Sequence, residues 1–248
     1  MNQFLNSKNF IPFAHRGANH LEIENTHEAF KKALDLGFKH IETDVRASKD
    51  GVPYLFHDRT LKRITGDNIA INKLSSNDLE KIRLKGNVLI PKLEDTFEEF
   101  PTTFFNIDAK SWDVVYPLAK TINHFKKWGN ICIGSFNDYR IAALRSLILK
   151  PICYSAGTLN SIKIIMMIYL GKIPSIKEPC IQLPLFYKGM KIINRNIVSK
   201  IKKSNTKLHI WGTNDKTHIL ELIDYGVDGL MVDDCILLKE ILTKKGLW

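Results

Sequence analysis

Four short groups of ionisable residues occur in the first half of the chain, each at or directly after an apolar run that predicts a strand. The groups are His15-Arg16, Glu42-x-Asp44, His57-Asp58 and Asp108-x-Lys110. Histidine titrates near neutral pH, carboxylates bind cations, and arginine and lysine bind phosphate oxygens. Residues at the carboxyl ends of parallel strands meet at one edge of a sheet. The spacing therefore predicts one site for proton transfer and phosphoryl chemistry.

Three acidic residues are the candidate cation ligands. Glu42 and Asp44 are two residues apart, so on an extended strand they share one face. Two carboxylates held close together repel each other unless a cation neutralises them. With Asp108, the set offers three carboxylates and no cysteine, which favours one divalent Mg2+ or Ca2+ ion over zinc. The alternative is that Glu42 and Asp44 form an exposed strand edge, and the neighbouring groups favour the cation site.

His15 and His57 are the candidate proton-transfer pair, one as the base and the other as the acid. Arg16 offers a planar fork for phosphate oxygens, Gly17 permits close backbone approach, and Lys110 adds a point charge for the transition state. The remaining histidines lack such neighbours and are expected at the surface or in local hydrogen bonds. They are His20, His27, His40, His124, His209 and His218.

Apolar runs that predict strands alternate with helical patterns along the chain. Strands are predicted at residues 11–14, 40–45, 103–107, 131–134, 151–154, 180–183, 207–211 and 229–232. Helices are predicted at residues 24–36, 93–100, 112–127, 137–147, 159–170, 190–204, 215–224 and 235–243. Eight βα units predict a (β/α)8 barrel, an α/β fold that typically needs about 250 residues. An open doubly wound sheet is the alternative, but no glycine-rich phosphate loop follows the first strand.

A further strand is predicted at residues 52–56, after the Asp50-Gly51 turn. Residues 58 to 90 are more polar and are read as a short insertion after the second barrel strand, with a helix near residues 77–82. The whole chain, residues 1–248, is then predicted to be a single barrel domain.

Composition narrows the partners of this site. The 248 residues carry a formal net charge of +10, which favours an anionic partner or simply keeps the surface solvated. The basic residues do not interleave with aromatic residues along one stretch, so no nucleic acid is expected as a partner.

The four cysteines form no C-x-x-C pair and are interpreted as reduced, buried thiols of a cytoplasmic protein. No secretory signal is recognisable, and the most apolar stretch, residues 162–170, is too short to span a bilayer.

Several segments together resemble the glycerophosphodiester phosphodiesterase family. They are His15-Arg16-Gly17, Glu24-Asn25-Thr26, Glu42-x-Asp44, His57-Asp58, Ile90-Pro91-Lys92-Leu93-Glu94-Asp95, Asn106-Ile107-Asp108-Ala109-Lys110, Ser135-Phe136, Trp211 and Gly226-Val227-Asp228-Gly229. The resemblance covers nearly the whole chain and is most specific over the first 60 residues. It implies a (β/α)8 barrel, one divalent cation, and hydrolysis of glycerophosphodiesters to glycerol 3-phosphate and an alcohol.

By matching position, the resemblance implies a role for each residue of the site. It assigns the metal to Glu42, Asp44 and Asp108, acid/base catalysis to His15 and His57, and phosphate binding to Arg16 and Lys110. Glu24 and Asp58 would support the site. Trp211, at a strand end, would line the mouth and contact glycerol or the leaving group, with packing in the core as the alternative.

Two departures from the family pattern stand out. The third metal ligand is usually Glu and is Asp108 here, one methylene shorter. The usual Thr-Asp-x-Pro is replaced by Val232-Asp233-Asp234-Cys235, a change expected to touch no catalytic residue.

Alternative functions stay open at this point. Residues 162–174 resemble a region of the family's lysophospholipase D-like members, so acylated substrates at an anionic membrane surface are one alternative. A phosphate-binding module without catalysis is the alternative of another class, and the intact set of histidines and acids argues against it.

Overall fold

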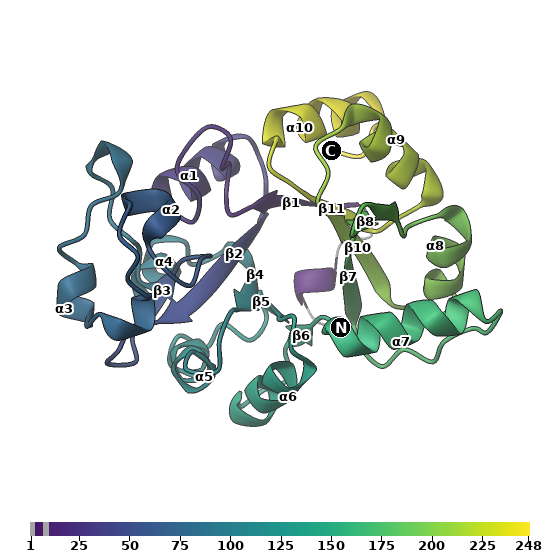
Figure 1. Cartoon of the computed structure of the whole chain (residues 1–248). Coiled ribbons are helices and arrows are strands. Elements are labelled where there is room, and N and C mark those ends of the chain that lie inside the picture. Colours follow the sequence, from purple (N-terminus) through teal and green to yellow (C-terminus); the bar gives the residue numbers. More distant parts are fainter. Residues whose placement is uncertain (1–2, 7–9) are drawn as a thin grey trace.

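Eight parallel strands form a nearly closed barrel in the computed structural model, which describes residues 3–6 and 10–248 (Figure 1). The strands are β1 (Ile11–His15), β2 (His40–Ala47), β4 (Phe104–Ala109), β5 (Ile131–Gly134), β6 (Cys153–Tyr154), β7 (Cys180–Pro184), β10 (Lys207–Trp211) and β11 (Gly229–Val232). They run in the spatial order β6-β5-β4-β2-β1-β11-β10-β7. The predicted barrel and its eight strands are confirmed.

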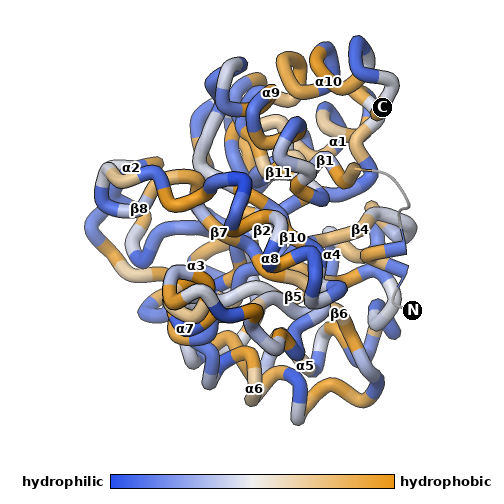
Figure 2. Tube along the Cα trace, turned by 90° about the vertical axis from the view of Figure 1, so that its right-hand side faces the viewer, coloured by the Kyte–Doolittle hydropathy of each residue, from blue (hydrophilic) through white to orange (hydrophobic). Residues whose placement is uncertain are grey.

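Helices surround this ring of strands (Figure 1). They are α1 (His27–Asp35), α4 (Leu93–Glu99), α5 (Val115–His124), α6 (Asp138–Leu147), α7 (Thr158–Tyr169), α8 (Arg195–Lys202), α9 (Lys216–Tyr225) and α10 (Cys235–Lys244). Thr26, Asn137, Asn194, Asp215 and Asp234 cap five of them with a side-chain oxygen that accepts a backbone N–H. Hydrophobic and hydrophilic residues alternate along α9 and α10 (Figure 2). Their buried apolar side chains belong to the main hydrophobic core.

The barrel has one weak seam, between β6 and β7. These two strands lie at opposite ends of the hydrogen-bonded order, and β6 has only two residues. A single isolated bridge, Ser155 to Cys180, joins them, supported by a hydrogen bond of 3.2 Å from the Ala156 amide to the Cys180 carbonyl. Closure on this side therefore rests on side-chain packing more than on a backbone ladder.

The predicted excursion after the second barrel strand packs beside the barrel. It contains β3 (Pro53–Leu55), α2 (Lys62–Thr65), η2 (Ile71–Lys73), α3 (Ser76–Leu79) and η3 (Lys85–Asn87). β3 runs antiparallel to β2, as the turn at Asp50-Gly51 requires. The excursion has its own small core, built around the buried ring of Tyr54.

One predicted helix was too long at its start. Residues 190–204 were predicted to be helical, but β8 (Phe186–Tyr187) and β9 (Met190–Lys191) form a small hairpin there, and α8 begins at Arg195. The hairpin turns at Lys188 and Gly189, both with positive φ, which a helix does not allow. Asn194 then provides the cap that starts the helix.

The amino-terminal end of the barrel is filled by an aromatic plug. Phe4, on the short helix η1 (Gln3–Leu5), contacts the rings of Phe13, His40 and Phe104. The carbonyl of Phe4 accepts a hydrogen bond of 3.0 Å from His40 Nε2. The open end is therefore the carboxyl end of the strands, where the candidate site lies.

Candidate active site

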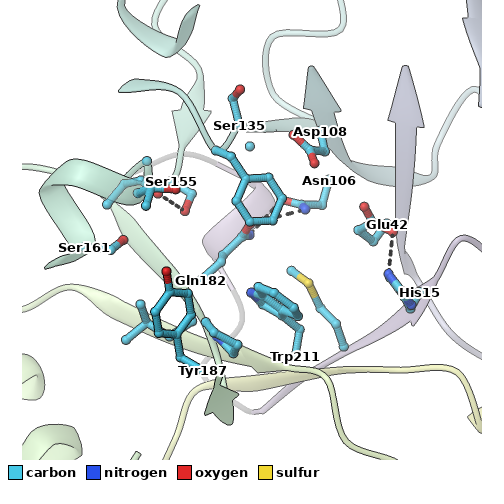
Figure 3. A pocket seen from close by; sticks show the side chains of 18 of the residues that line it. His15, Glu42, Asn106, Asp108, Ser135, Ser155, Ser161, Gln182, Tyr187 and Trp211 are labelled. Atoms are coloured by element: carbon cyan, nitrogen blue, oxygen red, sulfur yellow. Dashed lines mark hydrogen bonds and ion pairs between the residues drawn. The ribbon is translucent and has the colours of Figure 1, made fainter. Parts of the chain in front are cut away.

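A cavity of about 470 Å3 opens at the carboxyl ends of the barrel strands. His15, Arg16, Glu42, Asp44, His57, Asp108, Lys110 and Trp211, all singled out in the sequence, line it. Figure 3 shows His15, Glu42 and Asp108 on one side of the cavity, with Trp211 and Tyr187 on the other. Glu24 and Asp58 do not line this cavity but contact residues that do.

His15 is the last residue of β1, and a carboxylate that follows the neighbouring strand β11 fixes its ring. Its Nδ1 lies 2.6 Å from Asp233 Oδ1, just after β11. Because a carboxylate only accepts, this contact places a proton on Nδ1. The other nitrogen, Nε2, faces Glu42 at 3.7 Å. The ring therefore keeps Nε2 for proton exchange in the cavity.

His57 repeats the same arrangement in the same cavity. Its Nδ1 lies 2.7 Å from Asp58 Oδ1. Arg63 on α2 donates from Nε to Asp58 Oδ2 at 2.5 Å, which holds that carboxylate in place. The carbonyl of His57 accepts a hydrogen bond of 2.9 Å from Arg46 on β2. Hydrogen bonds therefore fix both the ring and the backbone of His57.

Two cations surround Asp44. Lys110 Nζ lies 2.7 Å from Asp44 Oδ1, and Arg16 Nε lies 3.1 Å from Asp44 Oδ2. Lys110 also reaches Asp108 Oδ2 at 2.6 Å, so its ammonium bridges two of the candidate metal ligands. Glu42 accepts a hydrogen bond of 3.1 Å from the backbone N–H of Arg16.

The pKa values of the two carboxyls on β2, Glu42 and Asp44, are shifted in opposite directions. Burial and the neighbouring Asp44 raise the pKa of Glu42 above its usual value. Burial also acts to raise the pKa of Asp44, but the ammonium of Lys110 and the guanidinium of Arg16 outweigh it and lower that pKa. Asp44 is therefore held ionised by its cations.

The two histidines also differ. Burial acts to lower the pKa of His15, but Glu42 and Asp233 outweigh it and raise that pKa. Burial lowers the pKa of His57, and the partly offsetting charge of Asp44 does not restore it. The two imidazoles of one cavity thus have pKa values that are pushed apart.

The loop after β1 positions the phosphate-binding candidate Arg16. Arg16 has a positive φ of 56° and Gly17 a positive φ of 81°, which turns the chain sharply below the cavity rim. Glu24 then holds the guanidinium of Arg16 at 3.1 Å and pairs with Arg63 at 2.6 Å. Two arginines from separate segments therefore share this one carboxylate.

Asn25 braces the same loop from within. Its amide donates to Asp44 Oδ2 at 3.0 Å and accepts from the Thr43 hydroxyl at 2.8 Å. The side chain is buried and its φ is positive, at 58°. Asn25 was part of the sequence motif, but the sequence assigned it no role.

Asp233, which keeps the aspartate of the family's Thr-Asp-x-Pro segment, contacts a residue of the candidate site, although the sequence assigned it no role. Asp233 bonds His15, and it also accepts from Asn19 Nδ2 at 2.5 Å and from Asn214 Nδ2 at 2.8 Å. The sequence contained a signal for the contact with His15. Asp233 follows the last predicted strand, and the last strand of the barrel, β11, pairs directly with β1.

A pair of amides forms the floor of the cavity. Gln182 Nε2 on β7 donates to Asn106 Oδ1 on β4 at 2.7 Å, and Asn106 Nδ2 lies 3.4 Å from Gln182 Oε1 (Figure 3). Both residues line the cavity and face each other across the barrel. No sequence signal identified this pair, because contacts between distant strands depend on barrel closure.

The carboxylates of the cavity offer oxygen donors for a divalent cation. Asp108 Oδ1 is buried without a hydrogen-bond partner in the described part of the chain, while its second oxygen contacts Lys110. In the described part of the chain, Glu42, Asp44 and Asp108 do not bring three ligand oxygens within 4.8 Å of one another. Lys110 instead lies between two of them. The all-oxygen donor set and the unpaired Asp108 oxygen fit Mg2+ or Ca2+.

Comparison with known proteins identifies the family. The model of the glycerophosphoryl diester phosphodiesterase family matches residues 15–237. The chain belongs to this family. As a family member it is a glycerophosphodiester phosphodiesterase, a hydrolase of phosphoric diesters, which confirms the resemblance and the enzyme class predicted from the sequence.

Relatives cover the chain almost end to end. The probable glycerophosphodiester phosphodiesterase 2 of Mycobacterium tuberculosis is 31% identical over 253 residues, which span 99% of this chain and 96% of the relative. Lysophospholipase D GDPD1 of Homo sapiens is 27% identical over 266 residues, spanning 92% of this chain and 85% of the relative.

Solved structures share the barrel. A phosphodiesterase of Oleispira antarctica, solved with the product sn-glycerol-3-phosphate, superposes with a TM-score of 0.78 at 21% identity, covering 96% of this chain and 99% of that chain. A glycerophosphoryl diester phosphodiesterase of Silicibacter pomeroyi gives a TM-score of 0.81 at 16% identity, covering 99% and 97%. Within the described residues, no helix of this phosphodiesterase is long and apolar enough to cross a bilayer.

Proposed function

We propose that this phosphodiesterase is metal-dependent and releases sn-glycerol 3-phosphate from substrates such as glycerophosphocholine and glycerophosphoethanolamine, with His15 and His57 as the acid/base pair. One observation carries the proposal. Each imidazole holds a carboxylate at Nδ1, and both rings line the same cavity. This arrangement leaves two Nε2 atoms for proton transfer at one substrate.

The chemistry needs one proton acceptor and one proton donor. One histidine takes the proton of the attacking hydroxyl, which belongs either to water or to the glycerol of the substrate. The other histidine gives a proton to the oxygen of the departing alcohol. A bond from phosphorus to the nucleophile forms as the bond to the alcohol breaks, so protons and charge balance over the cycle.

Arg16 and Lys110 would bind the phosphate oxygens. Glu42, Asp44 and Asp108 would hold the divalent cation, which supplies charge neutralisation and polarises a phosphate oxygen. Glu24 and Asp58 support the site by fixing Arg16 and His57. Trp211, which packs edge-on against Phe136 at the mouth, would contact glycerol or the leaving alcohol. The cytoplasmic location expected from the sequence is part of this proposal.

Release of glycerol 3-phosphate from glycerophosphocholine, with Mg2+ and Ca2+ compared, tests the proposal. We expect His15→Asn and His57→Asn to lower kcat by about 10²- to 10⁴-fold. His20→Asn is the matched control, because His20 faces Asp234 at 3.5 Å and does not line the cavity. Wild-type protein that turns over no diester with either metal would instead favour a phosphate-binding module without catalysis.

A second candidate substrate, a lysophospholipid, is favoured by the apolar wall of the cavity. Ile162, Ile165 and Met166 of α7 line it, together with Phe186 of the hairpin. The wall continues outward into exposed apolar residues. They are Leu159, Tyr169, Leu170, Ile173, Tyr187 and Met190. Such a wall could receive an acyl chain, and the exposed residues could contact an anionic membrane surface with nearby lysines.

Turnover of lysophosphatidylcholine and glycerophosphocholine separates the two substrates. If the wall binds an acyl chain, Met166→Glu lowers turnover of the lysophospholipid at least about tenfold and leaves glycerophosphocholine unchanged. Leu149→Glu, at an exposed leucine outside the cavity, is the control. Cosedimentation with anionic and neutral vesicles tests the membrane contact. Absence of lysophospholipid turnover by the wild type excludes this candidate.

A further inference from the structure

Three of the four cysteines meet inside the barrel, beneath the catalytic cavity. Cys132 of β5, Cys153 of β6 and Cys180 of β7 are fully buried free thiols. Their sulfur atoms all lie within 4.8 Å of one another. The cavity above does not include them, and the Asn106–Gln182 amide pair lines the floor between the two. This thiol cluster is therefore separate from the catalytic carboxylates.

The spacing of the sulfurs matches a tetrahedral metal site. Cys180 Sγ lies 3.7 Å from Cys132 Sγ and 3.9 Å from Cys153 Sγ. Zinc binds thiolate at about 2.3 Å, and tetrahedral geometry then sets two sulfurs about 3.8 Å apart. The cluster therefore offers three corners of a tetrahedron without rearrangement of its backbone.

A buried histidine without a well-formed hydrogen bond adds an independent observation. His209 of β10 is fully buried, and neither of its ring nitrogens makes a hydrogen bond of normal geometry among the described residues, while its polar neighbour is the thiol of Cys180. A buried unpaired polar group is costly, so such a group calls for a ligand. Its ring packs 4.8 Å from that of Phe13, which belongs to the same buried cluster as the three cysteines. β10 lies next to β7, which carries Cys180.

We propose that Cys132, Cys153, Cys180 and His209 form a structural zinc site that closes the barrel. Three cysteines and one histidine are a common structural zinc set, and soft thiolates select zinc over Mg2+ or Ca2+. Binding converts three thiols to thiolates and releases three protons, and the imidazole binds in its neutral form.

The position of the site explains what it does. Cys153 and Cys180 lie on the two sides of the β6–β7 seam, which backbone hydrogen bonding barely closes. Cys132 and His209 extend the set by one strand on each side of that seam. One ion bound to all four would link β5, β6, β7 and β10. Because Phe4 and the amide pair enclose the interior, the ion would enter during folding and resist chelators in the native protein.

The test is refolding of the full chain, with a reductant, in the presence of Co2+. Thiolate-bound tetrahedral Co2+ gives sulfur-to-metal charge-transfer bands and intense visible bands, whereas the oxygen ligands of the catalytic site give no charge transfer from sulfur. We expect these bands at about one ion per chain, displaced by Zn2+ during refolding. We also expect about one zinc per chain in native protein from zinc-supplemented cells after EDTA treatment and dialysis.

Substitutions of single residues test which side chains bind the metal. Cys180→Ala should lose the charge-transfer bands, and His209→Phe should shift or weaken them. Cys235→Ala should keep them, because the Cys235 thiol packs under α10 outside the cluster. The spectrum of the refolded wild type shows whether thiolates bind the metal, even if a variant fails to fold. Absence of the bands in refolded wild type, a disulfide among the three cysteines, or equal loss in Cys235→Ala would overturn the proposal.

Discussion

The Nδ1 atom of His15 and the Oδ1 atom of Asp233 lie 2.6 Å apart, although 218 residues separate them in the chain. β1 and β11 are hydrogen-bonded neighbours, so the first and last strands of the barrel bring the pair together. The carboxylate fixes the ring orientation and its tautomer, as paired acids do for catalytic and metal-binding histidines. Asp233 is thus a positioning residue for the proposed acid/base pair.

Substitution of Asp233 tests this relationship. Asp233→Asn removes the charge and allows the wrong tautomer of His15, so we expect kcat to fall by at least about tenfold with little change in KM. The pH–rate profile should also shift, which a loss of stability alone would not cause. Asp234→Asn is the control, because Asn caps a helix as well as Asp and Asp234 caps α10. Equal kcat in both variants would contradict the positioning role.

Stability should depend on Asp233 in a defined pH range. Burial acts to raise the pKa of the Asp233 carboxyl, but hydrogen bonds from His15 and Asn19 outweigh it and hold the pKa well below its usual value. A lowered folded-state pKa stabilises the fold above the unfolded value of about 3.9 and loses this contribution as pH falls below it. The difference in unfolding free energy between wild type and Asp233→Asn should therefore shrink below about pH 4. Urea titrations across this range measure it, and a difference that grows toward low pH would contradict the sign.

Much of the fold could be predicted from the sequence because apolar runs and helical periodicity alternate cleanly. The placement of His15, Glu42, His57 and Asp108 at one end of the barrel followed from their strand ends. What the sequence could not provide were contacts made by barrel closure. Those contacts involve Asp233 with His15, Asn106 with Gln182, and the buried thiol cluster with His209, which had been expected at the surface or in a local hydrogen bond.

Removal of divalent metal tests directly whether turnover depends on a bound cation. If Glu42, Asp44 and Asp108 bind a catalytic ion, EDTA followed by dialysis should abolish turnover, and Mg2+ or Ca2+ should restore it. An ion present at about 100 times its Kd should also stabilise the fold by about 2.7 kcal/mol, seen as a higher Tm. Asp108→Asn should weaken both responses. Full turnover after chelation would mean that the reaction needs no metal and that Lys110, which bridges Asp44 and Asp108, neutralises these carboxylates instead.

The amide pair on the cavity floor should couple β4 to β7. Asn106→Ala and Gln182→Ala each leave one buried amide unpaired, which we expect to cost about 1 to 3 kcal/mol of unfolding free energy. The double variant should cost less than the sum of the two, because each single variant already breaks the shared hydrogen bonds. Urea unfolding of the four proteins in the cycle measures the coupling. Strict additivity would show that the two amides do not stabilise each other.

The sharp turn after β1 should depend on the absence of a side chain at Gly17. A Cβ there would lie 2.8 Å from the backbone carbon and from the Cβ of Ala29, which must then shift. We expect Gly17→Ala to cost about 2 to 4 kcal/mol of unfolding free energy, the sum of the positive-φ strain and the steric clash. Gly66→Ala separates the two causes, because Gly66 has a φ of +91° with no heavy atom within 4 Å of its added Cβ. Gly66→Ala should cost only about 1 kcal/mol. Equal losses in the two variants would show that backbone conformation alone, and not the approach of α1 to the loop, requires glycine at position 17.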